Sequence, residues 1–289
     1  WQALVDQLAA LLPQVAEAAK RDSEPRRALS LYTLARSLAP DSTSILLGLG
    51  GTWWALGDLD QTLRAFESAR AQGPGNRQAL FSLVAVLKSM EREDEAMEIL
   101  RDSGYADYHT QLLELELQIA LAARPARDAL RGDRTEEAIE LYLSLLREHP
   151  NNPGLMHGLA DAYITGRRYQ EAADAYALAQ RVQPKNPWLR LGEANSLVAL
   201  GEPALAKGVL ERMGDPGDPK LLEAMFRTSL AIARMEADLL ARSGHVVEAY
   251  EKYSVLLEVD PGWETLGGLA RLYMSRWQYP VAQAFFEEA

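Results

Sequence analysis

The four histidines of the chain lack the spacing of a catalytic or metal-binding site. None of His109, His149, His157 and His245 falls in an HExxH or other paired-ligand motif. The chain has no cysteine, so a thiol nucleophile, a thiolate metal site and a disulfide framework are all excluded. We therefore expect no enzymatic activity, no catalytic residues, no metal and no cofactor.

Two glycine-containing segments also lack the context of a phosphate-binding loop. Residues 48–51 (GLGG) have no strand before them and fall inside a predicted helix, where glycine permits close packing. Residues 201–207 (GEPALAK) do not have the spacing of a phosphate loop. Acidic pairs such as Glu136-Glu137 stand at predicted helix starts, and we interpret them as solvated charge.

The secondary structure predicted around these residues follows a sequence repeat. The sequence EEAIELY at residues 136–142 returns as QEAADAY at residues 170–176, an offset of 34 residues. Pro150 closes the first copy and Pro184 the second, with the same offset. A period of this length indicates helix pairs that bury their apolar faces by stacking on neighbouring pairs.

This repeat resembles the tetratricopeptide repeat in its length, in its Ala followed four residues later by Tyr, and in its closing Pro. The resemblance implies an all-α fold, a right-handed α-solenoid of about eight repeats. Within each repeat, small residues at positions 8 and 20 are expected where the two helices cross, and glycine at position 15 between the helices. In this register the copies begin at or near Ala9, Thr43, Arg77, Ile119, Pro153, Pro187, Leu230 and Trp263.

Two steps between copies are longer than the others, at 42 and 43 residues. We interpret the surplus, in residues 105–118 and 214–230, as first helices lengthened by two turns; the alternative is an interruption where the solenoid bends. The long steps divide the array into segments 1–118, 119–217 and 218–289. Residues 215–219 (DPGDP) are the most loop-like in the chain, with Asp218 a predicted helix N-cap and residues 214–218 a predicted mobile junction.

Composition limits the class of partner. The net charge is −11 and each of the three segments is acidic, so no segment favours a nucleic-acid backbone. Hydrophobic residues make up 48% of the chain, yet no apolar run approaches the roughly 18 residues that a membrane span requires. Because the sequence starts at Trp1 without a Met and stops inside a predicted helix, we expect it to be part of a longer protein.

The family resemblance also implies a ligand groove. In tetratricopeptide proteins, positions 2, 5, 9, 12 and 13 of the first helices line the concave face where peptide segments bind. Carried over by position, the predicted groove residues are Leu47, Trp54, Phe81, Lys88, Arg127, His157, Asp161, Trp188, Leu191, Asn195, Arg234, Asp238 and Arg271. The alternative for each aromatic side chain is packing between neighbouring repeats.

One sub-pattern of the family is not met. Chaperone-binding members clamp a carboxylate with Lys at position 5 and Asn at position 9. Here Asn195 holds position 9, but position 5 of that repeat is Leu191. A chaperone co-adaptor role is therefore not expected.

A second resemblance covers mainly residues 180–289. Residues 185–191 (KNPWLRL) and 200–206 (LGEPALA) are similar to repeats in outer-membrane exporters of cellulose and related exopolysaccharides. This resemblance implies a non-catalytic periplasmic scaffold between a synthase and an outer-membrane pore, with protein segments, and polysaccharide as a further ligand, in the groove. The alternative is a cytoplasmic adaptor that binds peptide segments of protein partners. The oligomeric state is left open.

Overall fold

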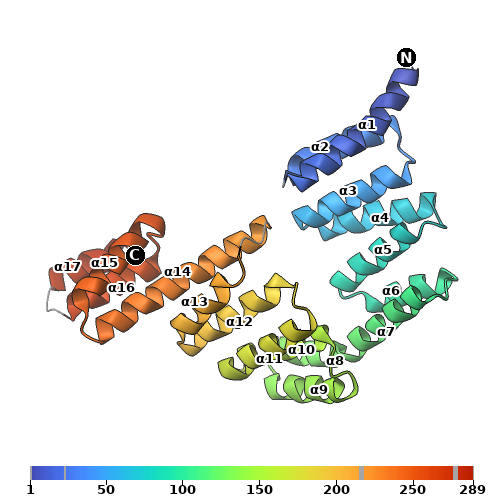
Figure 1. The fold of residues 1–289 in the computed structure, drawn as a ribbon. Helices are drawn as coiled ribbons and strands as arrows, with labels where there is room; N and C mark the ends of the chain where they lie inside the picture. The colour runs from blue at the N-terminus through green and yellow to red at the C-terminus, as the bar shows by residue number, and fades with distance from the viewer. Residues whose placement is uncertain (1, 23, 215–217, 276–278, 289) are drawn as a thin grey trace. The chain divides into compact units, whose positions relative to one another are not determined.

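The computed structural model describes residues 2–22, 24–214, 218–275 and 279–288 of the chain (Figure 1). All regular structure in these ranges is α-helical, which confirms the predicted fold class of an all-α array of helical repeats. The helices are α1 (Gln2–Arg21), α2 (Pro25–Leu38), α3 (Thr43–Leu56), α4 (Leu59–Gln72), α5 (Arg77–Ser89), α6 (Glu93–Asp102), α7 (Tyr108–Ala122), α8 (Arg124–Arg131), α9 (Thr135–Glu148), α10 (Pro153–Thr165), α11 (Tyr169–Val182), α12 (Pro187–Leu200), α13 (Pro203–Glu211), α14 (Pro219–Arg242), α15 (Val246–Val259), α16 (Trp263–Met274) and α17 (Tyr279–Glu288).

The helices form two compact units, Trp1–Ala122 and Ala123–Ala289. In the first unit, each helix from α1 to α6 packs on the next helix along the chain, and α7 packs on α6. In the second unit, the same neighbour-to-neighbour packing runs from α8 to α17. The three-segment division at residues 118 and 217 stays a prediction.

Fully buried alanines occupy the two predicted crossing positions of the repeat. Small side chains at these positions let the two helix axes approach closely. Thr62 and Val84, which are also fully buried, hold position 20 of the second copy and position 8 of the third. Ala160 of α10 and Ala172 of α11 show the arrangement within one repeat. The fully buried alanines at positions 8 and 20 are Ala16, Ala28, Ala96, Ala126, Ala138, Ala160, Ala172, Ala194, Ala206, Ala237, Ala249 and Ala270.

The turn between the two helices of a repeat requires left-handed backbone at position 15. Gly57 and Gly201 meet this need as αL caps with φ of 83° and 94°. Glu91, Asp133 and Arg167 hold the same position in their repeats, each with φ of 58°. Since a side chain in this conformation crowds its own backbone, these three turns carry strain that glycine would relieve.

Replacing Arg167 by glycine is expected to raise the free energy of unfolding by about 0.5–1 kcal/mol. Relief of the left-handed backbone is worth ~1–2 kcal/mol, and the extra freedom of glycine in the unfolded chain returns part of it. Urea denaturation of Arg167→Gly against the parent chain measures the difference. Gly201→Ala is the reverse control, and a stabilised Gly201→Ala variant would contradict the explanation.

The extra residues of both long repeat spacings lie largely in helices, but one spacing contains a single long helix and the other contains two separate helices. In the second, α14 is one helix of 24 residues, capped by the Asp218 side chain, which accepts a hydrogen bond from the Lys220 N–H at 2.9 Å. Residues 215–217 of the predicted mobile junction lie outside the described residues. In the first, α7 ends at Ala122 and α8 begins at Arg124, because Pro125 in the first turn of α8 lacks an N–H and cannot continue a preceding helix.

Candidate functional site

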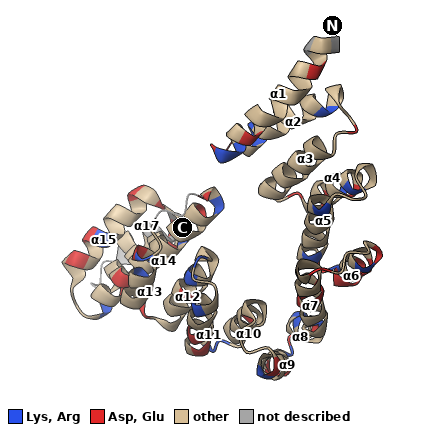
Figure 2. Cartoon of the chain, turned by 45° about the vertical axis from the view of Figure 1, so that its right-hand side comes forward, with Lys and Arg blue, Asp and Glu red and all other residues tan. Residues whose placement is uncertain are grey.

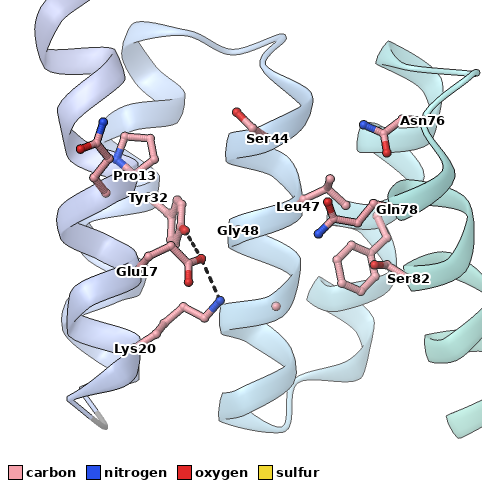
Figure 3. A pocket seen from close by; sticks show the side chains of 13 residues that line it. Pro13, Glu17, Lys20, Tyr32, Ser44, Leu47, Gly48, Asn76, Gln78 and Ser82 are labelled. Carbon is pink, nitrogen blue, oxygen red and sulfur yellow. Dashed lines mark hydrogen bonds and ion pairs between the residues drawn. The ribbon is translucent and has the colours of Figure 1, made fainter.

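A groove in the first unit follows the first helices α1, α3 and α5. It encloses about 520 Å³ and is open to solvent (Figure 3). Seven of its lining residues occupy repeat positions 2, 5, 9 or 12, the positions expected to face a ligand. They are Pro13, Glu17 and Lys20 of α1, Ser44, Leu47 and Gly51 of α3, and Gln78 of α5.

Glu17 and Lys20, the two charged residues lining this groove, neutralise each other. Lys20 Nζ lies 2.9 Å from Glu17 Oε1, and the buried Tyr32 of α2 donates its hydroxyl to the same oxygen. Burial opposes ionisation of Glu17, but the hydrogen bonds from Tyr32 and Lys20 outweigh it and hold the pKa of the carboxyl below its usual range. The remaining polar lining consists of uncharged amides and hydroxyls, so the groove offers hydrogen bonds without net charge.

Two glycines of α3 give the groove its floor. A Cβ on Gly48 would collide with the ring of Tyr32, so the glycine is what lets this ring reach Glu17. A Cβ on Gly51 would meet only Lys20 Nζ, at 3.4 Å, which is the far end of a flexible side chain. Gly48 is therefore required by packing, whereas Gly51 leaves space that a ligand can enter.

The tyrosine–carboxylate pair recurs in the second unit. Tyr176 donates its hydroxyl to Asp161 at 2.8 Å, and Tyr253 donates to Asp238 at 2.6 Å. As in the first unit, the tyrosine is at position 24 of the repeat and the acid at position 9. Burial, reinforced by the neighbouring carboxylate, raises the pKa of both phenols, so they remain donors at neutral pH.

Each of these two acids also has a basic side chain as a neighbour. His157 Nδ1 lies 3.2 Å from Asp161, and the hydrogen bond to that carboxylate raises the pKa of the histidine. The Arg271 guanidinium lies 3.5 Å from Asp238. The position-9 acids are thus held in place by neighbours of their own chain and act as fixed hydrogen-bond acceptors more than as free negative charges.

The predicted groove residues of the first unit fall outside the groove, Leu47 excepted. Trp54 is 38% exposed on α3, away from the lining. Phe81 is half-buried on α5, and the Arg77 guanidinium lies 5.5 Å from its ring centre. Lys88 forms an ion pair with Glu116 of α7 at 2.7 Å. These three assignments stay predictions, because no ligand contact tests them.

In the second unit, only some of the predicted groove residues contact one another. His157 and Asp161 form the pair described above, and Trp188 is 44% exposed in the first turn of α12. Asn195 accepts a hydrogen bond from Thr228 of α14 at 2.8 Å.

The remaining predicted positions of this unit are buried or paired. Arg127 is half-buried on α8, and Leu191 is buried in the core. Arg234 is mostly buried and pairs with Asp260 at 2.9 Å and with Glu264, so it serves packing between α14 and α16.

Sequence reasoning missed most of the residues that line the groove of the first unit. Pro13, Glu17, Lys20, Ser44 and Gln78 hold groove positions of the first three repeats, and the register that starts near Ala9 already placed them there. Their repeat positions alone would have been enough to predict them as groove residues.

Within the described ranges, no group of three or more His, Asp or Glu side chains is placed to hold a metal ion. None of the described helices is both long and apolar enough to cross a bilayer.

Comparison with known proteins identifies a family that is similar to part of the chain. The tetratricopeptide repeat family matches residues 15–77 and 124–187. The DnaJ homolog subfamily C member 3 of Gallus gallus is 24% identical over 158 residues, which cover 52% of this chain and 31% of that relative. The chain therefore matches about a third of the length of this curated relative.

Two solved structures are similar at low identity. The P58(IPK) TPR domain is 15% identical, with 97% of this chain and 92% of that chain covered and a TM-score of 0.38. A monomeric mutant of IFIT1 with Gppp-AAAA is 13% identical, with 92% and 67% covered and a TM-score of 0.43.

Proposed function

We propose that the array holds an extended polypeptide segment in the groove of its first unit, because residues 15–77 and 124–187 match the tetratricopeptide repeat family, whose repeats serve as protein-interaction scaffolds. The observation that carries this proposal is the groove lining. Residues of three successive first helices present amides, hydroxyls and one internally neutralised ion pair to an open space of about 520 Å³.

The chemistry of the lining defines the segment. A peptide backbone offers alternating donors and acceptors, and side-chain amides such as those of Gln14 and Gln78 can pair with both kinds of group. Because Glu17 already pairs with Lys20 and Tyr32, a bound peptide does not need a charged side chain to contact the groove. We therefore expect the affinity to change less than about threefold between low and high salt, since screening acts mainly on exposed unpaired charges.

The test is a selection of random peptides displayed on phage against the 289-residue chain, followed by calorimetry with the enriched peptides. Gly51→Phe fills the groove from its floor and should lower their affinity at least about tenfold, with the melting temperature unchanged or raised. The matched control is Gly208→Phe on α13, where a Cβ meets its nearest neighbour at 3.9 Å and no part of the groove is touched. Enrichment of the same peptides by the parent and by Gly51→Phe would contradict the proposal.

For the cellular setting, we propose the periplasmic scaffold of an exopolysaccharide export system. The support is the sequence similarity of residues 180–289 to exporter repeats, together with the exposed ring of Trp188, a surface suited to stacking on a sugar. Cellohexaose added to the chain should shift tryptophan fluorescence in the parent and not in Trp188→Ala. An unchanged parent spectrum would favour the cytoplasmic adaptor instead.

A further inference from the structure

The outer face of α15 combines exposed valines with carboxylates. Val247, Val255 and Val259 are 71%, 63% and 55% exposed. Glu248, Glu251 and Glu258 are also exposed. At about 100° per residue, these six side chains fall within roughly 120° of the helix circumference. The opposite side of α15 holds the buried residues Ala249, Tyr253 and Leu256.

Neither helix formation nor core packing accounts for these valines. Valine is among the weaker helix formers because its branched side chain loses rotamer freedom against the preceding turn. In α9, the repeat positions of the three valines are taken by Glu136, Ser144 and Glu148, which are polar and exposed. In α11, Leu178 and Val182 are also apolar at the positions of Val255 and Val259, but Gln170 holds that of Val247. Helix α15 combines all three valines on one face, and exposed apolar clusters of this kind mark interaction surfaces.

The carboxylates of this face differ from the position-9 acids, which are paired with side chains of their own chain. Within the part of the chain that the structure describes, Glu248, Glu251 and Glu258 have no side-chain hydrogen bond and no ion pair. Lys252, at the edge of the face, is held by Glu236 of α14 at 2.6 Å. Figure 2 shows the acidic positions of α15 in red. The face therefore presents three negative charges whose counter-charges must come from another molecule.

We propose that the outer face of α15 docks an amphipathic helix of a partner protein, one with lysine or arginine side chains interleaved with apolar ones. Apolar residues of such a helix cover the valines, and its cations meet the three glutamates. A second copy of this chain is a poor occupant, because two acidic faces repel and each chain has a net charge of −11. An anionic lipid surface is disfavoured by the same repulsion.

The test uses a fluorescein-labelled 18-residue peptide of leucine and lysine, with leucines at helical spacing, and its scrambled counterpart of identical composition. Fluorescence anisotropy with the 289-residue chain should show at least about tenfold tighter binding of the amphipathic peptide. Glu251→Lys and the double variant Val255→Ser/Val259→Ser should each reduce that affinity at least about tenfold, with melting temperatures unchanged because all three side chains are exposed.

Matched controls separate docking from general attraction to an acidic protein. Glu140→Lys changes the same repeat position on α9, and Leu178→Ser changes on α11 the position that Val255 holds. Both variants should keep the parent affinity. Equal binding of the scrambled peptide, equal loss with Glu140→Lys, or no binding at all would overturn the proposal. A parent dimer in sedimentation that Val255→Ser/Val259→Ser converts to monomer would assign the face to self-association instead.

Discussion

Tyr176→Ala is expected to lower the free energy of unfolding by about 3–5 kcal/mol, as loss of a large buried aromatic side chain does. The ring of Tyr176 is buried against α10 and α12, and its hydroxyl donates to Asp161. Removal opens a cavity between two repeats and takes away the hydrogen-bond partner that orients Asp161. Chemical denaturation followed by circular dichroism measures the loss.

Tyr176→Phe separates the packing of the ring from its hydrogen bond. The variant keeps the ring and leaves Asp161 with His157 and solvent, so we expect a cost of only ~1 kcal/mol. The His157 ring also contacts the Tyr176 ring edge-on, with centres 5.6 Å apart, and this contact survives in the variant. If Tyr176→Phe proved as damaging as Tyr176→Ala, the hydroxyl and not the ring would be the main source of stability.

Gly192→Ala is expected to destabilise the chain by about 1–3 kcal/mol, even though alanine is the better helix former. A Cβ at residue 192 of α12 would stand 2.5 Å from Tyr176 Cε1 and 2.6 Å from Cζ, and the ring is enclosed on its other sides. The cost of overpacking exceeds the gain of up to ~1 kcal/mol in helix propensity. Urea denaturation of the variant and the parent provides the measurement.

Gly208→Ala is the matched control within a helix of the same unit. Its Cβ would meet nothing closer than Arg212 Nη1 at 3.9 Å, so the propensity gain acts alone and we expect stabilisation by about 0.5–1 kcal/mol. If Gly192→Ala lowers the free energy of unfolding and Gly208→Ala raises it, the packing of the added methyl group against Tyr176 accounts for the difference. The same sign at both positions would show that the tyrosine ring yields to the added methyl.

The predictions for Tyr176 and Gly192 concern one contact between adjacent repeats, which recurs along the array. A glycine at position 6 of one repeat admits the position-24 tyrosine of the preceding repeat, as Gly48, Gly192 and Gly268 do for Tyr32, Tyr176 and Tyr253. The tyrosine in turn fixes the acid at position 9. Core packing and groove chemistry are therefore coupled, and loss of the tyrosine affects both.

The repeat could be predicted from the order of the residues alone. The 34-residue period, the alanines at positions 8 and 20 and the turn at position 15 are short-range patterns, and a helix pair has one way to bury such a pattern. The burial of Ala160 and Ala172 and the left-handed turns at Gly57 and Gly201 confirm that register. The same register predicted groove positions, and Leu47 at one of them lines the groove of the first unit.

The pairing of polar side chains depends on how the helices pack in three dimensions. Tyr32 reaches Glu17 across 15 residues of sequence, and Lys88 reaches Glu116 across 28, distances over which no local pattern specifies a partner. The open groove of the first unit exists because Gly51 leaves space beside Lys20, and the valines of α15 count as exposed only once their neighbours are placed. Periodicity determines which face of a helix is buried, whereas a binding surface depends on what the adjacent helices leave uncovered.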